Sequence, residues 1–108
     1  MAVLTVQQIG APSTPTYALV TASDTVLADP SGLIYHIKNT SGSPTTVTFT
    51  DPGLTPSGSV ATNPSFSCPA TTGDRMYKLP SSLQNSTGII TIANSAPAAG
   101  VVAAVFRA

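Results

Sequence analysis

Apolar and polar side chains alternate along two neighbouring runs in the first half of the chain. Leu33–Asn39 reads LIYHIKN and Thr45–Thr50 reads TTVTFT. Both runs place every second side chain on one face, as a half-buried β-strand does, and both are rich in β-branched and aromatic residues. The link between them, Thr40–Pro44, supplies turn chemistry, because Gly adopts positive φ and Pro cannot donate to a ladder. We predict a β-hairpin around which the rest of the chain is organised.

Short apolar runs separated by turn-forming residues continue through the rest of the sequence. They are Val3–Ile9, Tyr17–Val20, Thr25–Ala28, Ser65–Cys68, Arg75–Leu79, Gly88–Ala93 and Val101–Phe106. Strands spaced by roughly 8–12 residues, with no helical period in any long window, are typical of a sandwich or barrel. The pattern predicts an all-β fold: a single β-sandwich, immunoglobulin-like or jelly-roll-like, of about seven to nine short strands over residues 1–108. Val101–Phe106, apolar throughout, is predicted to be a central strand buried on both faces.

Two segments are predicted to meet neighbouring subunits. The N-terminal strand Val3–Ile9 lacks strict alternation, so it is either buried on both faces or lies against another chain. Its apolar members are the predicted contact residues: Val3, Leu4, Val6 and Ile9. The stretch Asp51–Pro64 is the longest without periodicity, and a loop of that length either makes contacts or is a plain surface loop.

Charge is scarce in this chain. Only 7% of its 108 residues are charged, with four acids, four bases and no net charge. No long-range field therefore attracts nucleic acid or an anionic membrane, and neither is a predicted partner. Low net charge favours association, so we expect partner subunits to cover much of the surface rather than hydroxyl groups alone to keep a monomer in solution. The sequence shows no secretory signal and no run long enough to span a bilayer, and we expect synthesis in a reducing cytoplasm.

Catalytic and metal-binding patterns are missing from the sequence. His36 is the only histidine and Cys68 the only cysteine, and a metal site needs several such ligands together. A Cys68–His36 nucleophile and base has no local support, and Cys68 reads as a small buried hydrophobe. The aspartates stand in turn contexts, where they cap backbone amides. We therefore predict no enzyme activity, no cofactor and no metal.

The densest charge cluster is Gly73–Lys78, which reads GDRMYK. It has two interpretations. Charges on an edge strand discourage unwanted pairing with other chains. Alternatively, Arg75 and Lys78 form a docking patch for an acidic partner surface, and they are included among the predicted intersubunit contacts.

Five features together resemble a known family. They are the N-terminal Val/Gln-rich strand and the stretches TPTYALVTASDTV (14–26), GLIYHIKNTSGSPTTVTFTDPG (32–53), TGDRMYKLPSSLQNSTGIITIANS (72–95) and VVAAVFRA (101–108). In this layout the chain resembles the small decoration, or cement, proteins of tailed-bacteriophage heads. The resemblance rests on the order of features and on no catalytic signature.

The resemblance implies a mechanical role at the capsid surface of a virion made in a bacterial host. Such proteins bind the outside of an icosahedral shell and bridge major capsid subunits, often as homotrimers. We therefore expect the major capsid protein and further copies of this chain as partners. A neck, tail or fibre-base subunit of a phage is the first alternative. A carbohydrate-binding sandwich that stacks sugars on Tyr35 or Tyr77 is the second.

Overall fold

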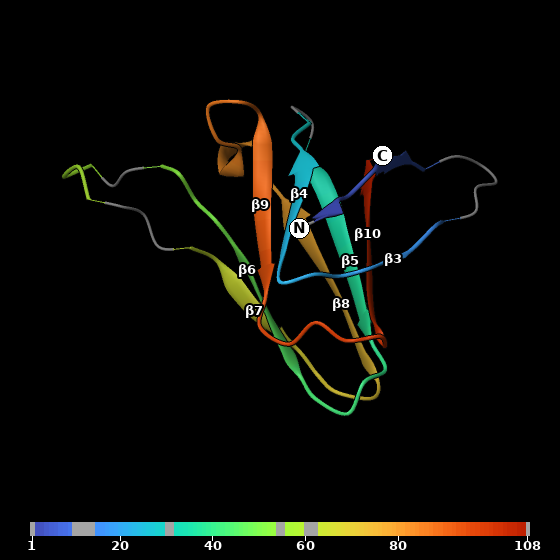
Figure 1. The fold of residues 1–108 in the computed structure, drawn as a ribbon. Helices are drawn as coiled ribbons and strands as arrows, with labels where there is room; N and C mark the ends of the chain where they lie inside the picture. The colour runs from blue at the N-terminus through green and yellow to red at the C-terminus, as the bar shows by residue number, and fades with distance from the viewer. Residues whose placement is uncertain (1, 10–14, 30–31, 54–55, 60–62, 108) are drawn as a thin grey trace.

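Strands from all parts of the chain assemble into two sheets in the computed structural model (Figure 1). The structure describes residues 2–9, 15–29, 32–53, 56–59 and 63–107. The strands are β1 (Ala2–Val3), β2 (Val6–Gln8), β3 (Ala18–Leu19), β4 (Ser23–Leu27), β5 (Leu33–Asn39), β6 (Thr45–Phe49), β7 (Ser65–Cys68), β8 (Gly73–Leu79), β9 (Ile89–Asn94) and β10 (Val101–Arg107). A 3₁₀ turn, η1 (Ser81–Leu83), precedes β9. The helix-free, all-β pattern predicted from the sequence is confirmed.

The two sheets pack face to face as a β-sandwich. Sheet A has the order β1-β4-β9-β6-β7, and sheet B has the order β2-β10-β5-β8 with β3 also paired to β10. The described residues hold ten strands, more than the seven to nine expected, because the predicted strand Val3–Ile9 is divided into β1 and β2. The predicted sandwich class is thus confirmed.

The predicted hairpin of residues 33–50 is wrong. Its two strands exist, but β5 lies in sheet B and β6 lies in sheet A, so they face each other across the core. The buried side chain of Asn39 shapes the connection. Its amide donates to the Ser43 carbonyl at 2.9 Å, and its Oδ1 accepts from the Ser41 amide at 2.9 Å. These bonds bend residues 40–44 into an arch between the sheets.

The predicted strand Val3–Ile9 is divided between the sheets. β1 pairs in parallel with β4 of sheet A, and β2 pairs in parallel with β10 of sheet B. Leu4 lies at the crossing, where its amide donates to the Thr25 carbonyl at 2.7 Å and its side chain is buried in the core. The lack of strict alternation in this segment therefore reflects a change of sheet.

β10 is a central strand, as predicted. It lies between β5 on one side and β2 with β3 on the other. Val101, Ala103 and Val105 face the core and are buried. On the outer face Ala104 is also buried, whereas Phe106 is only half-buried. Burial on both faces is thus confirmed at the middle of the strand.

An aromatic cluster joins the two sheets. Phe49 of sheet A lies 5.6 Å from Tyr35 and 4.9 Å from Tyr77 of sheet B, measured between ring centroids. Phe66 stacks on Tyr77 at 5.4 Å and 7°. Burying an aromatic ring removes a large apolar area from water, and offset or edge-on ring pairs add to that gain. This cluster therefore fixes the relation of β5 and β8 to β6 and β7.

Gly73 permits the close approach of β8 to the preceding turn. A Cβ at this position would lie 2.0 Å from the Pro69 carbonyl oxygen and 2.8 Å from Cys68 Sγ. We expect Gly73→Ala to lower the free energy of unfolding by about 1–3 kcal/mol, as overpacking in a tight interior does. Urea denaturation followed by circular dichroism measures this.

Gly42→Ala is the matched control, because a Cβ at Gly42 meets nothing within 4 Å. We expect a change within about 0.5 kcal/mol for this variant. Equal effects of the two substitutions would contradict the close packing around Gly73.

Candidate functional site

The outer faces of the two sheets differ in chemistry. On sheet B, the outward side chains of β5 and β8 include His36, Lys38, Asp74 and Lys78. On sheet A the register places only hydroxyl and aliphatic side chains outward. These are Val3, Ser23, Thr25, Leu27, Thr46, Thr48, Ser65, Ser67, Ile89, Thr91 and Ala93. We name this set the sheet A face.

The sheet A face carries no charged side chain among its described residues. Asp24 of β4 points the other way and is fully buried. Asp29 lies past the end of β4 and is joined at 3.6 Å to Arg107, the last residue of β10 in sheet B. Two aliphatic side chains project from the face into solvent: Val3 is 74% exposed and Leu27 is 62% exposed. The described part of the face is therefore uncharged and partly apolar, and it lacks the charged groups that are most costly to dehydrate.

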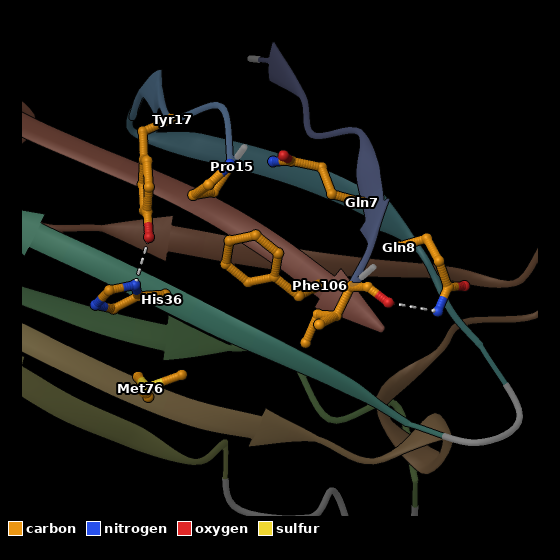
Figure 2. A pocket seen from close by; sticks show the side chains of 8 residues that line it. Gln7, Gln8, Pro15, Tyr17, His36, Met76 and Phe106 are labelled. Carbon is orange, nitrogen blue, oxygen red and sulfur yellow. Dashed lines mark hydrogen bonds between the residues drawn. The ribbon is translucent and has the colours of Figure 1, made fainter. Parts of the chain in front are cut away.

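A row of polar side chains crosses the outer face of sheet B. Tyr17 Oη lies 2.7 Å from His36 Nδ1 (Figure 2). His36 Nε2 bonds to an Asp74 carboxylate oxygen. With a proton on Nε2 donated to Asp74, Nδ1 accepts from the Tyr17 hydroxyl. Lys38 Nζ lies 4.5 Å from the centre of the Tyr17 ring, a cation–π distance. This row attaches the segment before β3 to the sheet.

A groove of about 280 Å³ lies beside this row, and its polar groups are already paired within the protein. It is lined by Gln7, Gln8, Ile9, Pro15, Tyr17, His36, Met76 and Phe106 (Figure 2). The Gln7 amide bonds the Thr16 backbone in both directions, at 2.6 and 2.8 Å. Gln8 Oε1 accepts from Arg107 Nε at 2.9 Å. The groove therefore offers a ligand mainly apolar contact.

A second hollow of about 370 Å³ runs along the N-terminal segment. Its lining consists of Val3, Leu4, Thr5, Gln7, Thr16, Ala18, Ala103 and Ala104. Small and aliphatic side chains predominate, and no charged side chain takes part. His36 is the one imidazole among the lining residues of the two hollows, and it is already paired with Tyr17 and Asp74.

The carboxyl of Asp74 has a lowered pKa because of its neighbours in the row. The hydrogen bond from His36 holds the pKa of the Asp74 carboxyl below its usual range, with smaller contributions from Lys38 and Arg75. A lowered pKa in the folded state stabilises the fold above the unfolded pKa of about 3.9, and that stabilisation is lost as the pH falls through the folded value. The bond between His36 and Asp74 therefore stabilises the fold more when the Asp74 carboxyl is ionised than when it is protonated.

A separate set of buried polar side chains lies between the two sheets. Asp24 is fully buried, and its carboxylate accepts from the Thr21 hydroxyl at 2.5 Å and from the Thr21 amide at 3.2 Å. Burial raises the pKa of Tyr35 far above its usual value. The Asn94 amide lies close enough to oppose that rise, yet the two side chains do not meet in hydrogen-bonding geometry. This group lies inside the fold, away from the outer faces.

The predicted contact residues do not form one patch. Val3 and Ile9 are exposed, Leu4 belongs to the core, and Val6 is half-buried against it. Arg75 and Lys78 are both exposed, but they differ by an odd number of positions along β8 and so point to opposite faces. The structure thus separates the two basic residues that the sequence grouped together. Of the loop 51–64, residues 54–55 and 60–62 lie outside the described residues.

The structure places the residues of two alternatives, a Cys68–His36 catalytic pair and sugar stacking on tyrosine rings. Cys68 is buried in the core, where burial raises the pKa of its thiol, whereas His36 lies on the outer face of the other sheet. The structure therefore keeps this pair apart. Tyr35 is fully buried, so a sugar cannot stack on it, whereas Tyr77 is half-buried and stacked on Phe66.

The described part of the chain holds neither a metal-binding cluster nor a membrane-spanning helix. No group of three or more His, Cys, Asp or Glu side chains is placed to hold a metal ion there. Among the same residues, no helix has the length and apolarity to cross a membrane.

Sequence reasoning missed Tyr17, Leu27 and Met76. Tyr17 bonds a residue 19 positions away, and neither partner carries a local signal of the other. Leu27 and Met76 are each 62% exposed, although an isolated Leu or Met in a strand reads first as a core residue. The alternation in β4 could have placed Leu27 outward, because Val26 is the buried member.

No protein-family model, curated protein or solved structure matches this chain. Its function is therefore argued from its own surfaces and sequence.

The pairing of His36 with Asp74 predicts a measurable pKa change. In His36→Gln the pKa of Asp74 should rise part of the way to about 3.9, since Lys38 and Arg75 remain nearby. Carbon-detected NMR titration of the carboxyl group measures it. Arg107→Gln, at the end of β10, should leave the Asp74 pKa unchanged; an unchanged pKa in His36→Gln as well would contradict the row.

Proposed function

We propose that this chain is a structural virion protein that decorates the outer surface of a tailed-phage head. In this proposal the sheet A face binds the major capsid protein. The observation that carries the proposal is the charge asymmetry of the sandwich. One outer face bears His36, Lys38, Asp74 and Lys78, whereas the described residues of the sheet A face bear no charge. The sequence resemblance to decoration proteins supports the same role.

Docking through an uncharged sheet face has a low dehydration cost. The cores of protein interfaces are depleted in charged residues for this reason. Hydroxyl groups can exchange water for a partner's backbone groups, and aliphatic groups gain directly from burial. Fully burying an exposed Leu or Val stabilises a complex by about 1.5–3 kcal/mol. Leu27 and Val3, the two most exposed large hydrophobic side chains of the face, are therefore its expected anchors.

The N-terminal segment takes part in docking through Val3 alone in this account. Leu4 and the β2 pairing hold the rest of the segment within the sandwich. Removing residues 1–10 would therefore disturb the fold together with the contact surface. Point substitutions on the face separate the two effects.

A Leu27→Lys variant tests the proposal. Purified chain is mixed with shells assembled from the major capsid protein of the phage that encodes it, and bound chain is measured after the shells are pelleted. We expect Leu27→Lys to weaken binding by at least tenfold, since an apolar contact is lost and a charge must be dehydrated. Thermal unfolding of each variant shows whether the fold is retained.

Leu19→Lys is the matched control. Leu19 is 56% exposed, against 62% for Leu27, but it lies on β3 beside sheet B. It should bind shells as the unmodified chain does. Equal binding by the two variants would contradict docking through the sheet A face, and failure of the unmodified chain to pellet with shells would contradict the decoration role itself.

A further inference from the structure

β8 is the open edge of sheet B. Within the described part of the chain it pairs only with β5, along all seven of its residues. It ends the strand order of sheet B, and its side chains on the outer face are exposed. An edge strand of this length presents unpaired amide and carbonyl groups to any strand that can lie beside it.

On its outer face, β8 carries one acid and one base at equal distances on either side of its central residue. Met76 is the middle residue of the strand, with Asp74 two positions before it and Lys78 two positions after it. All three point to the outer face of sheet B, since they pair with Lys38, His36 and Ile34 of β5. If two copies of this strand lie side by side and run in opposite directions, the negative end of one copy therefore lies beside the positive end of the other.

We propose that β8 pairs antiparallel with β8 of a second copy of this chain, with the two Met76 residues opposite each other. The two sheets B then join into one continuous sheet across a two-fold axis. On the outer face, Asp74 lies opposite Lys78 of the second copy, and this pair occurs twice. Opposite charges directly across an antiparallel pair stabilise it, and like charges destabilise it.

The side chains select this register over its neighbours. A two-fold axis perpendicular to the sheet keeps each face on the same side, so pairing must be centred on a residue. Centring on Arg75 places Arg75 opposite itself, which is unfavourable. Centring on Tyr77 leaves Lys78 opposite Met76 and shortens the ladder to residues 75–79. Only the Met76 register pairs all seven residues with opposite charges facing each other.

The remaining side chains of β8 also fit this register. Met76 is 62% exposed and gains a flexible apolar partner of the same kind. On the other face, Arg75 lies opposite Tyr77 of the second copy. The Tyr77 ring is held in place by its stacking on Phe66 at 5.4 Å, which suits a cation–π contact with an arginine.

The contact is expected to be weak and dependent on concentration. Two strands of seven residues bury less than the roughly 1,600 Å² of a standard stable interface. Scattered charges normally keep an edge strand from pairing, but that protection fails when the charges are self-complementary. The contact uses the edge of sheet B and not the sheet A face, so it stands or falls separately from the proposed function.

Charge reversal in the full-length chain tests the pairing. Sedimentation velocity over a range of concentrations should show a monomer–dimer equilibrium for the unmodified chain. Asp74→Lys and Lys78→Asp should each weaken dimerisation by about tenfold or more, because both copies of the pair become like-charged. The double variant D74K/K78D restores opposite charges in the same register and should recover dimerisation.

Controls separate the pairing from a loss of fold. Lys78→Asp leaves the His36–Asp74 bond in place, and Leu19→Lys, on β3, should dimerise normally. Circular dichroism checks the fold of every variant. A chain that stays monomeric at all concentrations would overturn the proposal. A double variant that behaves as the single ones do would overturn the register.

Discussion

The packing of four aromatic rings between the sheets is the constraint on which the rest of the structure depends. Phe49 and Phe66 from sheet A meet Tyr35 and Tyr77 from sheet B, so each of these strands must turn that face inward. Alternation along a strand then decides every outward side chain. The composition of both outer faces follows from this one packing arrangement.

The outer faces of the two sheets carry different chemistry. Sheet B is crossed by the segment before β3, which the Tyr17–His36–Asp74 row fastens in place. Its charges serve that attachment and the edge of β8. Sheet A is left with hydroxyl and aliphatic groups over its described outer surface, which suits burial against a large partner. Under our two proposals, the sheet A face contacts a shell while the edge strand β8 contacts a neighbouring copy.

The sequence predicted which side chains of a strand are buried better than it predicted which strands pair with each other. Alternation correctly identified the strands at residues 33–39 and 45–49, because burial of one face is a local property, and a continuous apolar run identified the strand at 101–107. Which strands pair is decided by contacts far apart in the chain. The turn-like residues 40–44 fit a hairpin as well as an arch, and only the burial of the Asn39 side chain decides between them. The His36 row depends on three distant segments, and no local pattern foretells it.

The claim that the sheet A face docks on a shell is tested most directly by a cryo-electron reconstruction of the phage particle that contains this chain. Our account predicts density for the sandwich on the outer surface of the head, with Leu27 and Val3 against the major capsid protein and the row of Tyr17, His36 and Asp74 turned away. Density on the head with the sheet A face toward solvent would contradict the docking face. Density confined to the neck or tail would contradict the decoration role.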